Sequence, residues 1–235
     1  MTGSDLDAVK TERLLVRLPR EADRNRFVDL FCNEDFMVFY PGVLTTEEAQ
    51  DRFDHMVAVC QAVSFGKQPV VELSSGRVVG YTGVDYIDFE GKTWLEWGYR
   101  LVPECRGLGY ATEASEALLA KAHQTYAGEL LAIIAPENLA SQNVCHKLGF
   151  TFWKQAPVQG DIRNLYTFLS ENPPYRPGQP DHREQRAVYN GSGEQPSATD
   201  VGYRTGVAIS HKLGEGGEHS PVQGFAAYSA FTTSA

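Results

Sequence analysis

The stretch Leu95–Glu116, LEWGYRLVPECRGLGYATEASE, decides the fold predicted for this chain. It indicates an apolar strand, a tight loop containing Arg106, Gly107 and Gly109, and the start of a long amphipathic helix. Glycines let the backbone approach a ligand closely, and the first N–H groups of a helix have no partner within the helix. Because the helix dipole is positive at that end, the loop is a candidate site for an anionic group.

Three readings of this glycine loop as an anion site can be compared. A P-loop needs Lys followed by Ser or Thr after the glycines, and the chain has neither pair there. A dinucleotide-binding fingerprint needs a very small residue where Thr112 stands. The third pattern, R-x-x-G-x-A, is formed by Arg106, Gly109 and Ala111. Such short patterns are common, so a glycine-rich turn without a ligand stays an open alternative.

Outward from this stretch, strand and helix patterns alternate along the chain. Strands are predicted at Glu12–Leu18, Gln68–Leu73, Arg77–Ile87, Thr93–Leu101, Leu130–Ala135, Thr151–Lys154 and Arg163–Leu169, and helices at Glu21–Phe31, from Thr45 onward, at Gly109–Tyr126 and at Asn138–Leu148. Thr45 and Glu48 have the spacing of a capping box at a helix start. The predicted fold class is α+β in three α/β/α layers, with a central, mixed, mostly antiparallel twisted sheet and helices on both faces.

Composition limits the partners of the chain. The formal net charge is −9 at pH 7, which argues against nucleic-acid binding through the phosphate backbone. No apolar run approaches the roughly 18 residues that a membrane span needs, so no membrane partner is expected. The N-terminal MTGSDLDAVK lacks the basic and apolar regions of a secretory signal, which favours the cytoplasm. The four cysteines and six histidines show no metal-ligand spacing, so we expect no metal and free thiols.

The composition changes sharply near residue 172. Residues 1–171 are predicted to form one domain, whereas 172–235 are rich in Gly, Pro, Ser and Gln and have few aliphatic residues. Such a segment cannot bury enough apolar surface to fold independently, so we expect a mostly disordered tail. Two stretches in it, Val201–Ile209 and Val222–Phe231, are exceptions that could form strand fragments or pack on the domain.

A second motif follows the glycine loop at a distance of about thirty residues. Pro136–Phe150, PENLASQNVCHKLGF, together with Pro103–Ala114, PECRGLGYATEA, resembles the GNAT family of N-acetyltransferases. Thr11–Leu14, TERL, and Leu95–Tyr99, LEWGY, are similar to its ribosomal-protein-alanine acetyltransferase (RimJ/RimL-like) branch. The resemblance covers roughly residues 10 to 170, with four segments in the right order.

This resemblance implies a fold and a reaction. The fold would be the GNAT acyl-CoA N-acyltransferase fold, and acetyl-CoA would be the cosubstrate. The reaction would be acetyl transfer to a primary amine, on a protein N-terminus or a small molecule, by direct attack in a ternary complex. A homodimer is compatible with this family resemblance. The alternative is a non-catalytic acyl-CoA-binding or regulatory module on the same fold, because this chain has Cys145 where many relatives have a tyrosine.

The resemblance also implies which residues hold the cofactor. The CoA pyrophosphate would meet backbone N–H groups of the loop and the helix start, which are those of Arg106, Gly107, Leu108, Gly109, Tyr110 and Ala111. Leu101 and Val102 would pair with the pantetheine arm, where their strand diverges from Leu130–Ala135. An N–H group near Val102 would stabilise the developing oxyanion. Asn138 would bond the arm near the thioester, or act only as a helix N-cap.

The sequence offers only a few candidates for the catalytic groups. Glu96 is the first candidate for the base, with a solvent-facing strand carboxylate as the alternative, and Glu104 is a weaker candidate. Cys145 is either an acid for the leaving thiolate or a small apolar residue that packs against the cofactor. The acidic domain suits a cationic amine. The resemblance points to Phe36–Tyr40, Tyr86, Trp94 and Trp97 as acceptor contacts, with core packing as the alternative for each aromatic residue.

Overall fold

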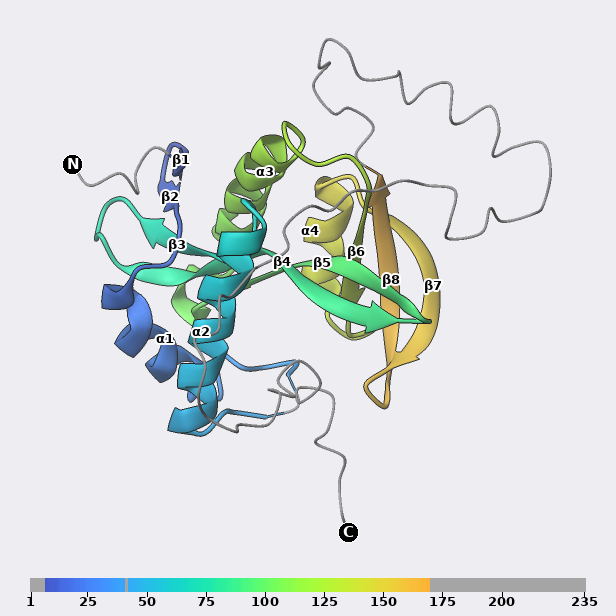
Figure 1. The fold of residues 1–235 in the computed structure, drawn as a ribbon, viewed down its shortest axis with the longest axis horizontal. Helices are drawn as coiled ribbons and strands as arrows, with labels where there is room; N and C mark the ends of the chain where they lie inside the picture. Colours follow the sequence, from blue (N-terminus) through green and yellow to red (C-terminus); the bar gives the residue numbers. More distant parts are fainter. Residues whose placement is uncertain (1–6, 41, 170–235) are drawn as a thin grey trace, which may run out of the picture. The chain divides into compact units, whose positions relative to one another are not determined.

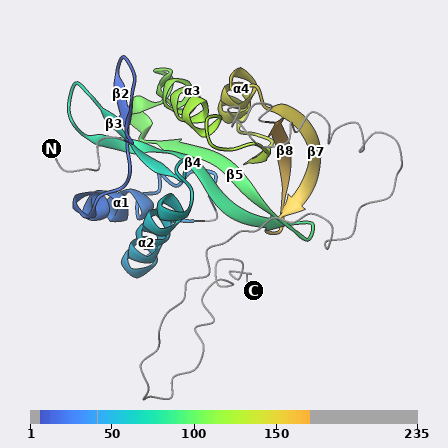
Figure 2. The same ribbon diagram turned by 45° about the horizontal axis from the view of Figure 1, so that its top comes forward.

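The computed structural model describes residues 7–40 and 42–169, which fold into a sheet with helices on both faces (Figures 1 and 2). The predicted tail, residues 172–235, lies outside the described residues. The strands are β1 (Val9–Lys10), β2 (Leu14–Val16), β3 (Gln68–Glu72), β4 (Val78–Phe89), β5 (Lys92–Leu101), β6 (Glu129–Ile134), β7 (Thr151–Val158) and β8 (Asp161–Leu169). The helices are α1 (Arg24–Phe31), α2 (Thr46–Ala62), α3 (Tyr110–Ala122) and α4 (Leu139–Lys147).

The strands form one sheet in the order β1-β2-β3-β4-β5-β6-β8-β7. Every neighbouring pair is antiparallel except β5 and β6, which are parallel. Figure 2 shows α1 and α2 against one face of the sheet and α3 and α4 against the other. This arrangement confirms the predicted fold class, an α+β fold with a mixed, mostly antiparallel sheet.

The parallel strands β5 and β6 pair over a very short length. Only Leu95 with Leu130 and Glu96 with Leu131 are in register, although β5 continues to Leu101 and β6 to Ile134. The two strands therefore diverge beyond Glu96 and Leu131. We call this divergence, between 97–101 of β5 and 132–134 of β6, the β5–β6 fork. Backbone groups of β5 that point away from β4 have no ladder partner there, as the predicted divergence requires.

Side chains alternate between the two faces of β5. The Tyr99 hydroxyl donates to the Ser141 hydroxyl of α4 at 3.1 Å, which places the odd-numbered residues on the α3/α4 face. The Arg100 guanidinium lies over the Tyr40 ring, 5.1 Å from its centroid, in the segment between α1 and α2. Glu96, Gly98 and Arg100 therefore share the α1/α2 face, which is opposite the face of the cofactor-motif helices.

The predicted capping box at the start of α2 is confirmed. The Thr45 N–H donates to Glu48 Oε2 at 2.8 Å, and the Glu48 N–H donates to Thr45 Oγ1 at 3.3 Å. The helix predicted at Gly109–Tyr126 ends earlier, at Ala122. The N–H groups of Gln124 and Thr125 donate to the carbonyls of Lys121 and Ala122, and these i→i−3 bonds tighten the last turn and end the regular ladder.

Other boundaries also differ from the predictions; for example, the strand predicted at Glu12–Leu18 is limited to Leu14–Val16. The strand predicted at Thr151–Lys154 runs to Val158, because its whole length pairs with β8 across the hairpin turn. The first turn of the helix predicted at Glu21–Phe31 is a 3-10 turn, Glu21–Asp23. Of the helices in residues 7–40 and 42–169, none combines the length and apolar character needed to cross a membrane.

Candidate active site

The glycine loop has the geometry of an anion site. Gly107 and Gly109 have φ angles of +74° and +83°, in the left-handed region that favours glycine. A Cβ atom at Gly107 would meet no atom within 4 Å, so the space beside it is open. Gly109 caps α3 without a side-chain hydrogen bond, whereas α2 and α4 are capped by Thr45 and Asn138. Within the described residues the N–H groups of 107–111 have no acceptor, as a bound anion would require.

Arg13 braces this loop from β1–β2. Its Nη1 donates to the Leu108 carbonyl at 2.9 Å, its Nε donates to Glu113 Oε2 at 2.7 Å, and its guanidinium lies 4.7 Å from the Tyr110 ring centroid. The Thr11 hydroxyl also donates to Glu113, at 2.6 Å. Burial alone would raise the pKa of Glu113, but these bonds outweigh it and lower that pKa. Glu113 is thus a paired carboxylate, although it lies in the first turn of α3.

This brace was missed from sequence, although its signal was present. Thr11 and Arg13 belong to the TERL segment that suggested the RimJ/RimL-like branch, yet no role had been assigned to either residue. They lie about one hundred residues from Glu113 in the chain. Only the packing of α3 beside β2 brings them together.

Arg106 plays a different part from the glycines beside it. Its backbone N–H donates to the Pro103 carbonyl at 3.1 Å and so already has an acceptor. Its side chain donates to the Leu101 carbonyl at 3.2 Å and to the Asp35 carbonyl at 2.5 Å. The backbone N–H groups without an acceptor in the described residues are therefore those of 107–111, one residue fewer than the predicted set. The Arg106 side chain links the loop to the segment between α1 and α2.

At the fork, the prediction for Val102 needs a correction of one residue. The Val102 N–H donates to the Val79 carbonyl at 2.9 Å, so it points toward β4 and is not available to an oxyanion. Backbone groups of successive strand residues point in opposite directions. The Leu101 N–H therefore points toward the fork, together with the Leu101 carbonyl that Arg106 reaches.

The start of α4 lies beside the fork. Asn138 Oδ1 accepts the Ser141 N–H at 3.0 Å, which confirms the N-cap, and its amide nitrogen remains available. Cys145 is 4% exposed, and burial raises the pKa of its thiol to about 12. Burial also raises the pKa of Tyr99, which outweighs the opposing bond to Ser141. Tyr99 is a protonated phenol next to Cys145, and the sequence analysis gave it no role although it lies in the LEWGY segment.

On the α1/α2 face, Glu96 is part of a group of paired charges. Its Oε2 accepts from Lys67 Nζ at 3.1 Å, and the Glu96 side chain is 17% exposed. Lys67 Nζ is also 3.7 Å from Asp85 Oδ2, and Asp85 lies directly opposite Glu96 on β4. Asp85 is bound in turn by Arg52 at 2.9 Å and by His55 at 2.8 Å, both from α2. We call these five residues the ion-pair cluster.

The ion-pair cluster shifts the pKa values of its members. Burial disfavours the charged forms of both Lys67 and Asp85, but the opposite charges around each group have the larger effect on its pKa. The carboxylates of Glu96 and Asp85 raise the pKa of Lys67. The His55 hydrogen bond and the charges of Lys67 and Arg52 lower the pKa of Asp85. Both groups are therefore charged at neutral pH. Glu104, the weaker candidate base, is an exposed carboxylate 3.6 Å from Arg77.

The predicted acceptor aromatics divide into two groups. Phe36, Trp94 and Trp97 are buried, which supports the core-packing alternative for these three. Tyr86 is 49% exposed, and Val38, Phe39 and Tyr40 between α1 and α2 are exposed by similar fractions. Arg100 joins this segment to β5, since its Nη1 contacts Met37 Sδ at 2.9 Å.

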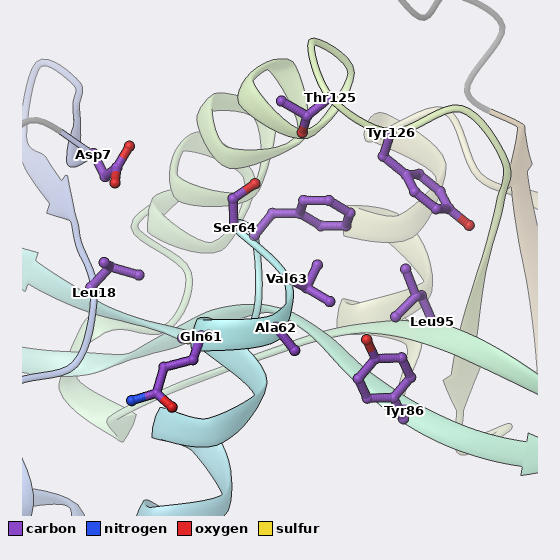
Figure 3. A pocket seen from close by; sticks show the side chains of 12 residues that line it. Asp7, Leu18, Gln61, Ala62, Val63, Ser64, Tyr86, Leu95, Thr125 and Tyr126 are labelled. Carbon is purple, nitrogen blue, oxygen red and sulfur yellow. The ribbon is translucent and has the colours of Figure 1, made fainter. Parts of the chain in front are cut away.

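A cavity opens beside Tyr86. It has a volume of about 620 Å³ and is bounded by the end of α2, the link to β3 and the turn after α3 (Figure 3). Thr125 and Tyr126 line it, so it sits at the opposite end of α3 from the glycine loop. Tyr86 is the only predicted site residue among those that line it.

All four cysteines are free thiols, as expected. In residues 7–40 and 42–169 there is no group of three or more His, Cys, Asp or Glu placed to hold a metal ion.

Comparison with known proteins places this geometry in a family. The model of the acetyltransferase (GNAT) domain matches residues 13–151. The uncharacterized N-acetyltransferase YnaD of Bacillus subtilis (strain 168) is 25% identical over 157 residues, covering 65% of this chain and 89% of that protein.

Two solved structures share the fold. A GNAT-family acetyltransferase from Bordetella pertussis has a TM-score of 0.61 and 22% identity, covering 68% of this chain and 98% of that one. RimL, a ribosomal L7/L12 acetyltransferase in complex with coenzyme A, has a TM-score of 0.56 and 16% identity, covering 69% and 97%. The family model spans more than half of the chain, from the TERL segment through the glycine loop and α4 to the start of β7. The chain therefore belongs to the GNAT family of acetyltransferases.

Proposed function

We propose that this protein transfers an acetyl group from acetyl-CoA to a primary amine, by direct attack while both substrates are bound. The observation that carries the proposal is the β5–β6 fork, which opens beside a helix N-terminus whose N–H groups have no acceptor in the described residues. An elongated anionic cosubstrate fits such a pair of features, because its diphosphate needs N–H donors and its amide arm needs unpaired strand groups.

The residues present fit acetyl-CoA. The N–H groups of 107–111 would hold its pyrophosphate, Leu101 would pair with its pantetheine arm, and the Asn138 amide would reach the same arm. The adjoining Val102 main chain completes the strand end that borders the arm, with its N–H bound to β4. When bound, acetyl-CoA supplies an activated acetyl thioester. The Leu101 N–H points to the side where negative charge on the acetyl oxygen would need a donor.

The acceptor amine would arrive on the α1/α2 face. Glu96 lies on that face of β5, and it would bind the ammonium and accept its proton directly or through a water molecule. The exposed side chains of Val38, Phe39 and Tyr40 would contact the apolar part of the acceptor. The structural similarity to RimL supports a RimJ/RimL-like choice of acceptor, a protein N-terminus, with a small-molecule amine as the other class.

The leaving thiolate needs a proton, and Cys145 stays a candidate donor. A thiol with a pKa of about 12 is a weaker acid than an ordinary thiol of pKa about 8.5, so transfer from it to the thiolate would be uphill. We therefore favour packing as the role of Cys145, with the proton supplied by water. We propose a cytoplasmic location, consistent with the free thiols.

A thiol-release assay with a panel of amines and peptide N-termini tests the proposal. We expect turnover of at least one amine, a fall of more than about tenfold in Glu96→Gln, and a change of less than about twofold in Glu104→Gln. The Glu104 variant is the matched control, since it removes a carboxylate from the exposed loop. If acetyl-CoA binds but no amine is acetylated, the non-catalytic acyl-CoA-binding module replaces this proposal.

A further inference from the structure

The carboxylate of Glu96 is held in an unusual position along β5. A Cβ atom at Gly98 would lie 3.1 Å from Glu96 Oε1, 3.5 Å from Oε2 and 3.6 Å from Lys67 Cε. The carboxylate therefore lies over Gly98, two positions further along the same face of the strand. Since β5 runs from there toward Leu101, the carboxylate is directed along the strand to the β5–β6 fork. Any larger residue at 98 would occupy its place.

Lys67, the residue before β3, holds the Glu96 carboxylate through an ion pair. Its backbone is fixed, because its N–H donates to the Val84 carbonyl at 3.0 Å and its carbonyl accepts the Cys60 thiol at 3.2 Å. Its ammonium is 3.1 Å from Glu96 but 3.7 Å from Asp85. Asp85 already has Arg52 and His55 as partners, which leaves Lys67 to pair mainly with Glu96.

The two oxygens of Glu96 are consequently different. Oε2 accepts from Lys67, whereas Oε1, beside Gly98, accepts no hydrogen bond from the described residues. An acceptor amine could reach Oε1 without displacing Lys67. A second ammonium within a few ångströms would also favour loss of the proton from that amine, because like charges disfavour the charged form. The neutral amine is the form that attacks a thioester.

We propose that Lys67 and Gly98 are positioning residues that hold the Glu96 carboxylate directed toward the fork and open to the acceptor amine at Oε1. The inference rests on the proposed function, and it assigns roles to two residues for which the sequence analysis gave none. Gly98 gives the carboxylate its space, and Lys67 gives it its orientation. Lys67 also promotes deprotonation of the amine that docks beside it.

Other charged or titratable groups lie near Lys67 and Glu96, and their effects must be distinguished from those of this pair. They are Arg52 and His55 of α2, Tyr81 and Asp85 of β4, Arg100 of β5, and Tyr40 between α1 and α2. His55 Nε2 lies 2.8 Å from Asp85 Oδ1, and Arg52 Nη2 donates to Asp85 Oδ2 at 2.9 Å, so both side chains contact the neighbouring carboxylate. Arg100 is directed to Met37 and the Tyr40 ring.

The test is a set of double-mutant cycles with Glu96→Gln, read by kcat and KM. Gly98→Ala is expected to lower kcat about tenfold while the acetyl-CoA affinity changes less than about twofold. Its added methyl group meets only side-chain ends, so the variant is expected to fold. In the Glu96→Gln background the same substitution should change kcat less than about twofold, since a residue acting through Glu96 has no additive effect.

Lys67→Met is expected to lower kcat about tenfold with little change in the acetyl-CoA affinity, and Lys67→Arg to restore most of the loss. Lys154→Met is the control, because it removes another lysine–carboxylate pair, with Glu90, far along the sheet. Additive effects in the cycles, or a kcat for Lys67→Met equal to that of Lys154→Met, overturn the positioning role. Absence of turnover in the wild type overturns the proposed function itself, so the two failures are distinguishable.

Discussion

The two faces of the sheet at the fork are built in different ways. The proposed cofactor side uses two continuous segments, the glycine loop with the start of α3 and the cap of α4, and its main groups are backbone N–H donors. The proposed acceptor side uses the ion-pair cluster, which brings together residues from α2, β4, β5 and the link before β3. Backbone donors need only local geometry, whereas paired buried charges need every partner in place. The first kind of site can be found by motif, and the second only from the fold.

The largest effect on acetyl-CoA binding is expected from a substitution in the glycine loop. Gly109→Glu is predicted to weaken acetyl-CoA binding more than about 100-fold, because it puts a strained residue and a negative charge at the anion site. Isothermal titration calorimetry with acetyl-CoA measures this loss of affinity. Gly160→Glu, at a similar φ of +90° in the β7–β8 hairpin, is the matched control and should bind normally. Equal binding by wild type and Gly109→Glu would remove the loop from the cofactor site.

A smaller effect is expected at the brace. Arg13→Met removes the bond to the Leu108 carbonyl and leaves Glu113 less well paired beside the anion site, so acetyl-CoA affinity should fall about tenfold. The same calorimetric titration applies. Arg24→Met, which removes a guanidinium bound to Glu21 and Asp54 on the α1/α2 side, should leave affinity within about twofold. If both variants bind alike, the brace does not shape the loop.

The smallest effect is expected for Cys145. If the thiol only packs, Cys145→Ala should lower kcat less than about threefold and leave the pH profile unchanged, with a modest loss of thermal stability from the missing sulfur. Cys32→Ala is the control, because that free thiol lies at the end of α1, away from the fork. A loss in kcat of about a hundredfold in Cys145→Ala alone would restore Cys145 as the acid.

The sequence by itself determined the features that depend on short-range geometry. The α2 capping box, the Asn138 cap and the glycine loop each involve residues within a few positions of one another, so spacing and residue type are sufficient. Alternating strand and helix patterns were likewise enough for the fold class. The family resemblance added the divergence of β5 from β6, which the register of that pair supports.

The tertiary structure decided what depends on pairing across the chain. The pairing of β5 with β4 turns the Val102 N–H away from the fork and leaves that of Leu101 toward it, a choice that alternation alone does not fix. Glu96 meets Lys67, and Glu113 meets Arg13, only because strands distant in sequence lie next to each other. Long-range electrostatic partners have no local pattern, and for this reason the direction of the Glu96 carboxylate was set by the fold.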